Sequence, residues 1–315
     1  MKLLQRTEEL AGIPGPLVLA IGVFDGLHLG HQSVIRTAQQ TAKNCGGRAV
    51  ILTFDPHPAR ILKPEAAPRM LTSTPHKVRL LREWALDHAL ILSFSHQTAQ
   101  TLPDHFVREL AAHCRPLHAI CVGESWSFGR ERRGNLHLLS ALGEELGFRA
   151  IGVPELLLDG AVVSSTRIRQ AVSAGDLATA SKLLGRPYAV AGTVVHGRQL
   201  GRSIGFPTAN LPISHEQVPP HGVYAVLVSR PGTTALLPGV ANVGLRPTVG
   251  ESNPQITLEV HLFDRSGDFY GEFWEVRFVD FLRPEKRFPD VEALRHQIAQ
   301  DAALARSHLG AIGEE

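Results

Sequence analysis

Two histidines, His28 and His31, stand three residues apart in a glycine-rich stretch that begins at Gly22. Gly22 and Gly26 permit a sharp turn and a close approach of the backbone. An apolar run precedes the stretch and a helical pattern follows it, so both imidazoles can share one face at the positive end of a helix and donate to phosphate oxygens. A single turn histidine is more often solvated or capping, but this spaced pair favours a nucleotide-phosphate site.

A second phosphate-binding pattern begins a later helix. Ser164 or Ser165 can cap that helix, and Thr166 falls in its first turn. Arg167 and Arg169 add positive charge at a helix end that already attracts anions. Alone, the pattern is equally consistent with an ordinary N-cap followed by solvent-exposed arginines, so the phosphate-binding interpretation depends on the histidine pair.

The second half of the chain has its own glycine-rich run, from Gly192 to Asn210. It lacks the G-x-x-x-x-G-K-[ST] order of a P-loop, although its backbone amides can surround phosphates. The side chains of Thr208 and Asn210 offer the oxygen ligands that Mg²⁺ prefers. As a bare pattern, P-T-A-N is also typical of a simple turn.

Glu259 is a candidate general base, because a carboxylate can take a proton from a hydroxyl within hydrogen-bond reach. It alternates with the apolar Leu258 and Val260 along a predicted strand. The residues alone therefore favour a surface glutamate over a catalytic one.

The first half alternates short apolar runs with helical patterns, which predicts βαβ units and a parallel sheet covered on both faces. Ligands bind outside the carboxyl ends of such strands, so we expect a site at 22–31, 55–58 and 123–134. The predicted strands are 17–22, 49–54, 89–94, 118–123 and 150–153, and the predicted helices are 31–43, 74–84, 104–113, 136–146 and 165–173.

The pattern changes near residue 186, where short runs between turn signals begin to alternate apolar and polar residues. This period is typical of half-buried antiparallel strands, and it favours a β-barrel or sandwich with a C-terminal helix. We expect domains at 1–186 and 187–315. The predicted strands are 188–196, 222–229, 235–243, 255–263 and 273–279, and the helix is 291–308.

Charge and composition limit the partners. A net charge of +2 over 315 residues argues against nucleic acid or an anionic membrane. The three cysteines, at positions 45, 114 and 121, have no metal-ligand spacing, which favours a reducing compartment. No signal peptide is predicted at a start that contains Glu8 and Glu9, and no apolar run is long enough for a membrane-spanning helix. We expect a soluble cytoplasmic protein with at most weak self-association.

The first half resembles a known enzyme family in several motifs. H28-L-G-H31 with S164-S-T-R-I-R169 resembles the nucleotidyltransferase superfamily, which has a Rossmann-like fold. With T53-F-D-P-H-P58 and V122-G-E-S-W-S-F-G129, the half resembles the FMN adenylyltransferase part of bacterial bifunctional FAD synthetases. The resemblance implies that His28 and His31 bind ATP phosphates and stabilise the charge that builds up during transfer, with Mg²⁺ sharing that charge.

The same resemblance implies further binding residues. Asp55 and His57 would form a loop beside the flavin phosphate, and Phe128 would stack on adenine or isoalloxazine, although core packing explains Phe128 equally. Phosphates would be gripped from the opposite side by Ser165, Thr166 and Arg169, and the remaining expected binding residues are Gly22, Phe24, Asp25, Gly26, Ser125, Ser164 and Arg167.

The chain departs from the family pattern at three positions. Ser125 and Trp126 replace an Asp or Asn and a Phe, and Asn135 stands where an Asp is common. These departures put the rate of the adenylyl step in doubt but leave its identity unchanged.

The second half resembles riboflavin kinases over about residues 186–305, through G201-R-S-I-G-F-P-T-A-N210, G239-V-A-N-V-G-L-R-P-T248 and L258-E-V-H-L262. The resemblance implies a six-stranded antiparallel barrel that binds ATP, Mg²⁺ and riboflavin, with Glu259 as the base and Thr208 and Asn210 as metal ligands. Other expected contacts are Gly201, Gly205 and Pro207 in the loop, Asn242, Arg246 and Thr248 as organisers of the site, and Arg283 with the last helix over the flavin.

Together these expectations describe an enzyme that phosphorylates riboflavin to FMN and then adenylylates FMN to FAD and pyrophosphate. One alternative is an adenylyltransferase half that uses another phosphorylated acceptor. The attached kinase-like half argues against it, because its product would be the substrate of the first half. Another alternative is a flavin-binding regulator with decayed sites, against which the retained His28, His31, Thr208, Asn210 and Glu259 argue.

Overall fold

The computed structural model describes residues 1–197, 201, 204–246, 255–265 and 267–310, without the side chains of Arg246 and Gln255. The chain divides into two compact units. The N-terminal unit is Met1–Pro68 with Lys77–Ser165, and the barrel unit is Arg69–His76 with Thr166–Glu315. The compact units thus divide after Ser165, while the functional boundary near residue 186 stays a prediction.

A six-stranded parallel sheet forms the centre of the N-terminal unit, in the order β1-β4-β3-β2-β5-β6. Each neighbouring pair of strands is parallel. The strands are β1 (Lys2–Leu4), β2 (Leu17–Ile21), β3 (Arg48–Asp55), β4 (His88–Ser93), β5 (Leu117–Gly123) and β6 (Arg149–Val153).

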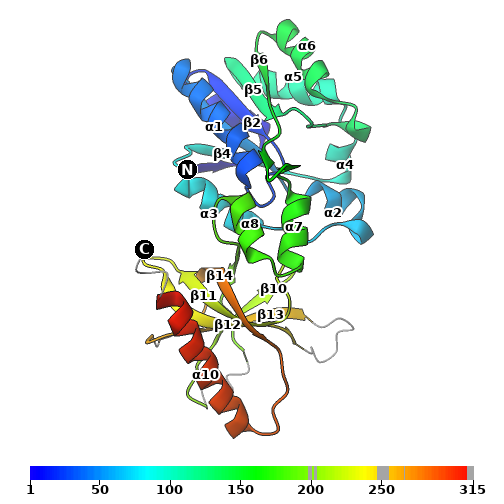
Figure 1. The fold of residues 1–315 in the computed structure, drawn as a ribbon. Coiled ribbons are helices and arrows are strands. Elements are labelled where there is room, and N and C mark those ends of the chain that lie inside the picture. The colour runs from blue at the N-terminus through cyan, green and yellow to red at the C-terminus, as the bar shows by residue number, and fades with distance from the viewer. Residues whose placement is uncertain (198–200, 202–203, 247–254, 266, 311–315) are drawn as a thin grey trace. The chain divides into compact units, whose positions relative to one another are not determined.

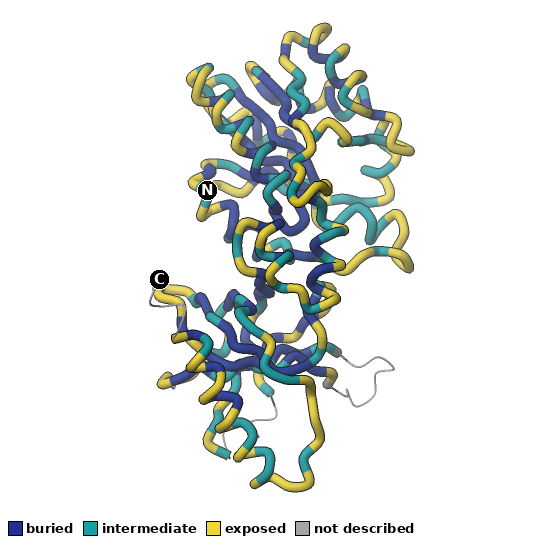
Figure 2. The backbone as a smooth tube through the Cα atoms, viewed as in Figure 1, coloured by how far each residue is buried: buried dark blue, intermediate teal, exposed yellow. Residues whose placement is uncertain are grey.

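Helices cover both faces of this sheet (Figure 1). On one face α1 (Leu29–Asn44) and α3 (Thr74–Glu83) pack over Val18 and Ala20 of β2. On the other, α5 (Pro103–His113) and α6 (Leu136–Leu146) pack over Leu17, Leu19 and Ile21. Because both faces are covered, β2 is buried along its whole length, and the central strands are dark blue in Figure 2.

The remaining elements of the N-terminal unit are short. They are η1 (Thr7–Gly12), α2 (Pro58–Leu62), η2 (Pro64–Ala66), α4 (His96–Ala99), η3 (Arg130–Arg132), and the hairpin of β7 (Leu157–Leu158) and β8 (Ala161–Val162). Helix α7 (Ser165–Ser173) begins where this unit ends.

The barrel unit contains a six-stranded antiparallel sheet in the order β10-β13-β12-β11-β14-β9. Beyond β9, the N–H of Val195 donates to the carbonyl of Asn210 at 2.9 Å, so the two edges meet and the barrel is nearly closed. Its strands are β9 (Ala189–Thr193), β10 (Ala209–Ile213), β11 (Gly222–Ser229), β12 (Leu237–Arg246), β13 (Gln255–Leu262) and β14 (Phe273–Pro284), and its helices include α8 (Leu177–Leu184) and α10 (Val291–Gly310).

The segment 69–76 belongs to the barrel unit although it lies in the first half of the sequence. Met70 pairs with the chain at Glu216, and its N–H donates to the carbonyl of His215 at 2.8 Å. His76 Nε2 lies 3.2 Å from Oε2 of Glu275 on β14, with both side chains buried. No feature of the sequence predicted this placement.

Both expected fold classes are confirmed, and the predicted helices 136–146 and 165–173 match α6 and α7 residue for residue. Strands β1 and β10 were not predicted, because β1 has three residues and Pro212 interrupts the alternation in β10. None of the described helices carries an apolar stretch of the length that a bilayer crossing needs.

Candidate active sites

The turn between β2 and α1 has an unusual backbone. Phe24 (φ 51°), Gly26 (φ 83°) and Leu27 (φ 46°) all adopt the left-handed conformation, which is costly for the two residues with side chains. Phe24 and Leu27 are almost fully buried, so packing holds them there. A Cβ on Gly22 would lie 2.8 Å from the Phe24 ring, so glycine is required for this close approach.

His28 occupies the N-cap of α1, where its Nδ1 accepts the backbone N–H of His31 at 3.3 Å. The two imidazole rings stack with centroids 3.6 Å apart and an interplanar angle of 18°. Because Nδ1 of His28 accepts this N–H, the neutral form of the ring carries its proton on Nε2.

His31 is neutral at physiological pH. Burial is the main cause that lowers the pKa of His31 well below its ordinary value of 6.5, and electrostatic interactions with His28 and Lys77 act in the same direction. Its Nδ1 is buried and has no hydrogen-bond partner among the described residues. A buried polar atom in this state is one that a bound ligand can satisfy.

A cavity of about 320 Å³ opens beside the histidines, a size within the range of small-molecule sites. The predicted site residues that line it are Gly22, Phe24, His28, His31, Ser125 and Ser164. The structure thus joins the end of β2, the start of α1, the loop after β5 and the approach to α7 around one space, as expected at the carboxyl ends of parallel strands.

Trp126 lines this cavity, whereas Phe128 is not among its lining residues. Phe128 is 7% exposed and lies in the hydrophobic core against Phe106. The Trp126 ring stacks on it with centroids 4.3 Å apart. The Trp126 ring thus belongs to the cavity wall at a position where this chain departs from the family pattern, and stacking of Phe128 on a ligand stays a prediction.

The start of α7 is tied to the glycine-rich turn. Ser165 Oγ donates to the carbonyl of Asp25 at 2.9 Å, and Ser164 lines the cavity. Farther along α7, Thr166 is exposed and Arg167 is half-buried. Arg169 Nε donates to the backbone carbonyl of Arg69 at 2.7 Å, so part of its donor capacity holds the segment 69–76.

The D-P-H-P segment follows β3 directly. Asp55 is the last residue of β3, and His57 caps α2 by accepting the N–H of Ala59 at 3.1 Å. The cavity-lining residues that the structure describes include neither Asp55 nor His57. Their contact with the flavin phosphate stays a prediction.

Lys77 also lies in this region, although it was not among the predicted site residues. It is 5% exposed, and its Nζ donates to the carbonyl of Val23 at 2.6 Å and to Thr53 Oγ1 at 3.2 Å. Burial lowers its pKa to about 8, against the opposing influence of nearby carboxylates. The spacing in the sequence could have indicated its burial. Leu80 and Leu81, three and four residues after Lys77, are buried, so all three residues lie on the same face of α3.

In the barrel, Glu259 stands between two asparagines. Asn210 of β10 lies opposite it on one side, and Asn242 of β12 lies opposite it on the other. Paired residues in antiparallel strands project to the same face, so the carboxylate has a carboxamide on each side. Glu259, Asn242, Thr208 and Arg283 line one cavity of about 330 Å³.

The predicted loop residues precede β10. Gly201 accepts the N–H of Phe206 at 2.7 Å, and a Cβ on Gly201 would lie 2.2 Å from the Phe206 carbonyl. Gly205 has a φ of 90°, which favours glycine. The carbonyl of Pro207 lies 2.9 Å from His261 Nδ1. These contacts place Thr208 at the cavity wall.

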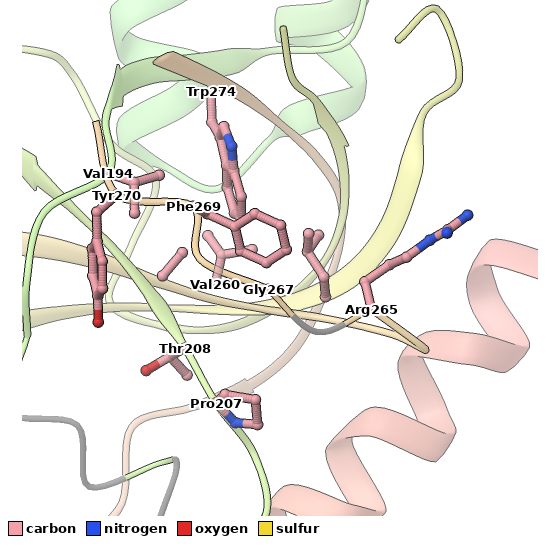
Figure 3. A pocket seen from close by; sticks show the side chains of 11 residues that line it. Val194, Pro207, Thr208, Val260, Arg265, Gly267, Phe269, Tyr270 and Trp274 are labelled. Carbon is pink, nitrogen blue, oxygen red and sulfur yellow. The ribbon is translucent and has the colours of Figure 1, made fainter. Parts of the chain in front are cut away.

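A second cavity of about 260 Å³ shares Thr208 with the first and has an aromatic wall. Figure 3 shows Phe269 and Trp274 together, with Tyr270 across the cavity and the Thr208 hydroxyl directed toward the Tyr270 side. The ring of His196 stacks on Tyr270 with centroids 3.5 Å apart. No role was predicted for these aromatic residues from the sequence.

Arg283 anchors the last helix. Its guanidinium makes a two-pronged contact with the buried carboxylate of Asp301 on α10, with Nη2 2.7 Å from Oδ2. Leu294 and Ile298 of α10 line the Glu259 cavity. Arg246 ends β12, but its side chain and Thr248 lie outside the described residues.

The barrel offers oxygen donors that fit Mg²⁺. Thr208 and Asn210 are two residues apart on an extended chain and project to one face, and Glu259 lies opposite Asn210. Hydroxyl, carboxamide and carboxylate oxygens are the ligands of this hard cation. Among the described residues, no three His, Cys, Asp or Glu side chains gather into a metal-binding cluster.

The histidine pair at a strand-to-helix turn, and the Glu259 cavity that shares Thr208 with a second barrel cavity, fit the class of nucleotide-dependent transferases. A riboflavin kinase family model matches residues 184–309, and an FAD synthetase family model matches residues 12–167. The chain belongs to the family of bifunctional riboflavin kinases/FMN adenylyltransferases.

Curated relatives align along nearly the whole chain. The bifunctional riboflavin kinase/FMN adenylyltransferase of Escherichia coli strain K12 is 38% identical over 311 residues, covering 98% of each chain. The enzyme of the same name from Haemophilus influenzae is 37% identical over 289 residues, covering 92% of this chain and 93% of its own. A solved structure titled a macrolide-efflux protein from Streptococcus pneumoniae is similar in fold, with a TM-score of 0.80, 30% identity and coverage of 97% and 98%.

Proposed function

We propose that the chain makes FAD in two steps, with one step assigned to each half. Residues 187–315 phosphorylate riboflavin with ATP, giving FMN and ADP, and residues 1–186 adenylylate FMN with a second ATP, giving FAD and pyrophosphate. The observation that carries this assignment is that one chain contains both the stacked His28–His31 pair and the Glu259 cavity. The product of one site is the acceptor for the other.

In the kinase step, Glu259 is the general base. Riboflavin lies in the cavity that contains Glu259, and ATP lies in the aromatic cavity, with Thr208 between them. The carboxylate takes the proton of the 5′-hydroxyl as its oxygen attacks the γ-phosphorus. The bond from that phosphorus to the β–γ bridging oxygen breaks, and ADP leaves with its electron pair.

In the adenylyl step, no covalent enzyme intermediate is needed, because the phosphate of FMN is already ionised. One of its oxygens attacks the α-phosphorus of ATP, and the bond to the α–β bridging oxygen breaks to release pyrophosphate. His28 and His31 donate N–H groups to phosphate oxygens, and this support comes from groups held in place before the reaction. Phosphate oxygens also contact Ser165, Thr166 and Arg169.

Thr208 and Asn210 hold Mg²⁺ in the barrel. When bound, the ion neutralises the charge of the nucleotide phosphates. The residues themselves bring the Thr208 hydroxyl and the Asn210 carboxamide to the face that carries Glu259, so the acceptor hydroxyl and the phosphates meet at the same place.

Cytoplasmic location, at most weak self-association and the absence of a nucleic-acid partner complete the proposal. All three cysteines are free, as in a reducing compartment. The net charge of +2 does not favour a polyanionic partner.

A product assay tests the function. The full chain with riboflavin, ATP and Mg²⁺ should yield FMN and then FAD in timed chromatograms, and FMN with ATP should yield FAD and pyrophosphate. Formation of neither flavin nucleotide contradicts the proposal. Formation of FMN without FAD, also from added FMN, favours an adenylyltransferase half with another acceptor.

A further inference from the structure

The carbonyl oxygen of Val23 accepts hydrogen bonds from two buried side chains. Lys77 Nζ donates to it at 2.6 Å, and Thr53 Oγ1 donates to it at 2.9 Å. Lys77 also donates to Thr53 Oγ1 at 3.2 Å, so the three groups form one closed network. Lys77 comes from α3 and Thr53 from β3, whereas Val23 belongs to the turn before α1.

This network fixes a peptide unit of the cavity wall. In a trans peptide the carbonyl and the following N–H point in opposite directions. Holding the Val23 carbonyl toward Lys77 therefore turns the N–H of Phe24 away from it. Val23 and Phe24 both line the cavity, and Phe24 has a left-handed backbone with its ring edge against His31.

A lysine is a costly choice for a purely structural role at this place. Lysines are seldom buried, and burial of an ammonium group disfavours its charged form. The groups that act on its charge are Asp25 in the same turn and Asp55 at the end of β3, both of which favour the ammonium form. The negative charges of Asp25 and Asp55 thus oppose the effect of burial on Lys77.

We propose that Lys77 is a positioning residue for adenylyl transfer, which holds the Val23–Phe24 peptide so that His28 and His31 keep their stacked arrangement at the cavity. This rests on the proposed function of the N-terminal half. Lys77 acts through the backbone of the turn, so its loss should lower turnover more than FMN binding.

The lysine has a second effect, on His31. The groups that lower the pKa of His31 besides burial are His28 and Lys77. With His31 still buried, removal of the ammonium group should therefore raise the pKa of His31.

Two substitutions and one control test the proposal in the full chain. Lys77→Met keeps the length of the side chain and removes its donor, and we expect kcat for FAD formation to fall about tenfold. The KM for FMN should stay within about twofold. Thr53→Val removes one donor to Val23, so a fall of about threefold is expected, and the double variant should resemble Lys77→Met because both act on one carbonyl.

Lys43→Met is the matched control, since Lys43 is exposed near the end of α1. NMR titration of the His31 ring measures its pKa in the wild type and in Lys77→Met, and an upward shift is expected. Wild-type turnover in Lys77→Met, or a fall in turnover with an unchanged His31 titration, overturns the proposal.

If circular dichroism shows that Lys77→Met does not fold, the kinetics of Thr53→Val test the proposal in its place. A selective fall in its kcat supports positioning, and wild-type kinetics overturn it. If the wild type itself forms no FAD, the proposed function fails; if the wild type is active, wild-type FAD turnover in Lys77→Met overturns the role of Lys77 alone.

Discussion

The imidazole rings of His28 and His31 lie face to face with centroids 3.6 Å apart, and the backbone N–H of His31 donates to Nδ1 of His28. The helix start therefore fixes the ring of His28, and this ring in turn lies against His31. A Cβ on Gly30 would come within 3.2 Å of the His28 ring, so the residue between them must be small. The sequence H-L-G-H is thus one structural unit.

Loss of either imidazole should stop FAD formation selectively. His28→Asn retains a side chain that can cap the helix, and His31→Phe retains a ring for stacking, but each removes a donor. By analogy with the loss of a charge-stabilising donor, we expect kcat for FAD formation to fall by about 10²–10³-fold. Separate assays with riboflavin and with FMN measure the two activities.

In these variants FMN formation should remain within about twofold of the wild type, because the kinase residues lie in the barrel unit. Equal loss of both activities would show that the sites are not separate. His113→Asn serves as a control, since His113 is at the end of α5.

Glu259→Gln should have the opposite effect. Glutamine preserves the shape between Asn210 and Asn242 but cannot take the proton of a hydroxyl. We expect riboflavin phosphorylation to fall by about 10²–10⁴-fold, the usual contribution of a general base. FAD formation from added FMN should be unchanged. Wild-type kinase rates in this variant would remove Glu259 as the base.

The parallel half could be predicted well because each of its features is local. An apolar run bounded by glycine specifies a buried strand, and the apolar period of 136–146 specifies α6. The histidine pair was recognisable for the same reason, since a strand, a turn and a helix start fall within about ten residues.

The parts that escaped prediction depend on contacts between distant residues. Asn210, Glu259 and Asn242 come together only through the register of three strands. Trp126 replaces Phe128 at the cavity because one ring covers the other. In the sequence, Lys77 looks like an ordinary polar residue of a helix. Its role becomes visible only from its hydrogen bonds to Val23 and Thr53, which are distant in the sequence.

The last prediction concerns the buried pair of His76 and Glu275, which holds the segment 69–76 in the barrel unit. Burial opposes ionisation of Glu275, but His76 and Arg277 outweigh it and lower its pKa from the ordinary 4.5 to about 2. A carboxyl whose pKa is lower in the folded state binds fewer protons there. Its stabilisation is therefore fully present above about pH 5 and is lost as the pH falls toward 2.

Glu275→Gln should thus lower the free energy of unfolding by on the order of 3 kcal/mol at neutral pH, and the difference from the wild type should shrink between about pH 5 and pH 2. Trp274 is fully buried in the barrel, and with Trp84 and Trp126 replaced by Phe it reports urea unfolding by fluorescence. Glu292→Gln, at an exposed position on α10, is the control and should show no such pH-dependent difference. A Glu275→Gln difference that stays constant from pH 7 to pH 2 would contradict an ionised Glu275, because proton linkage requires that difference to shrink in acid.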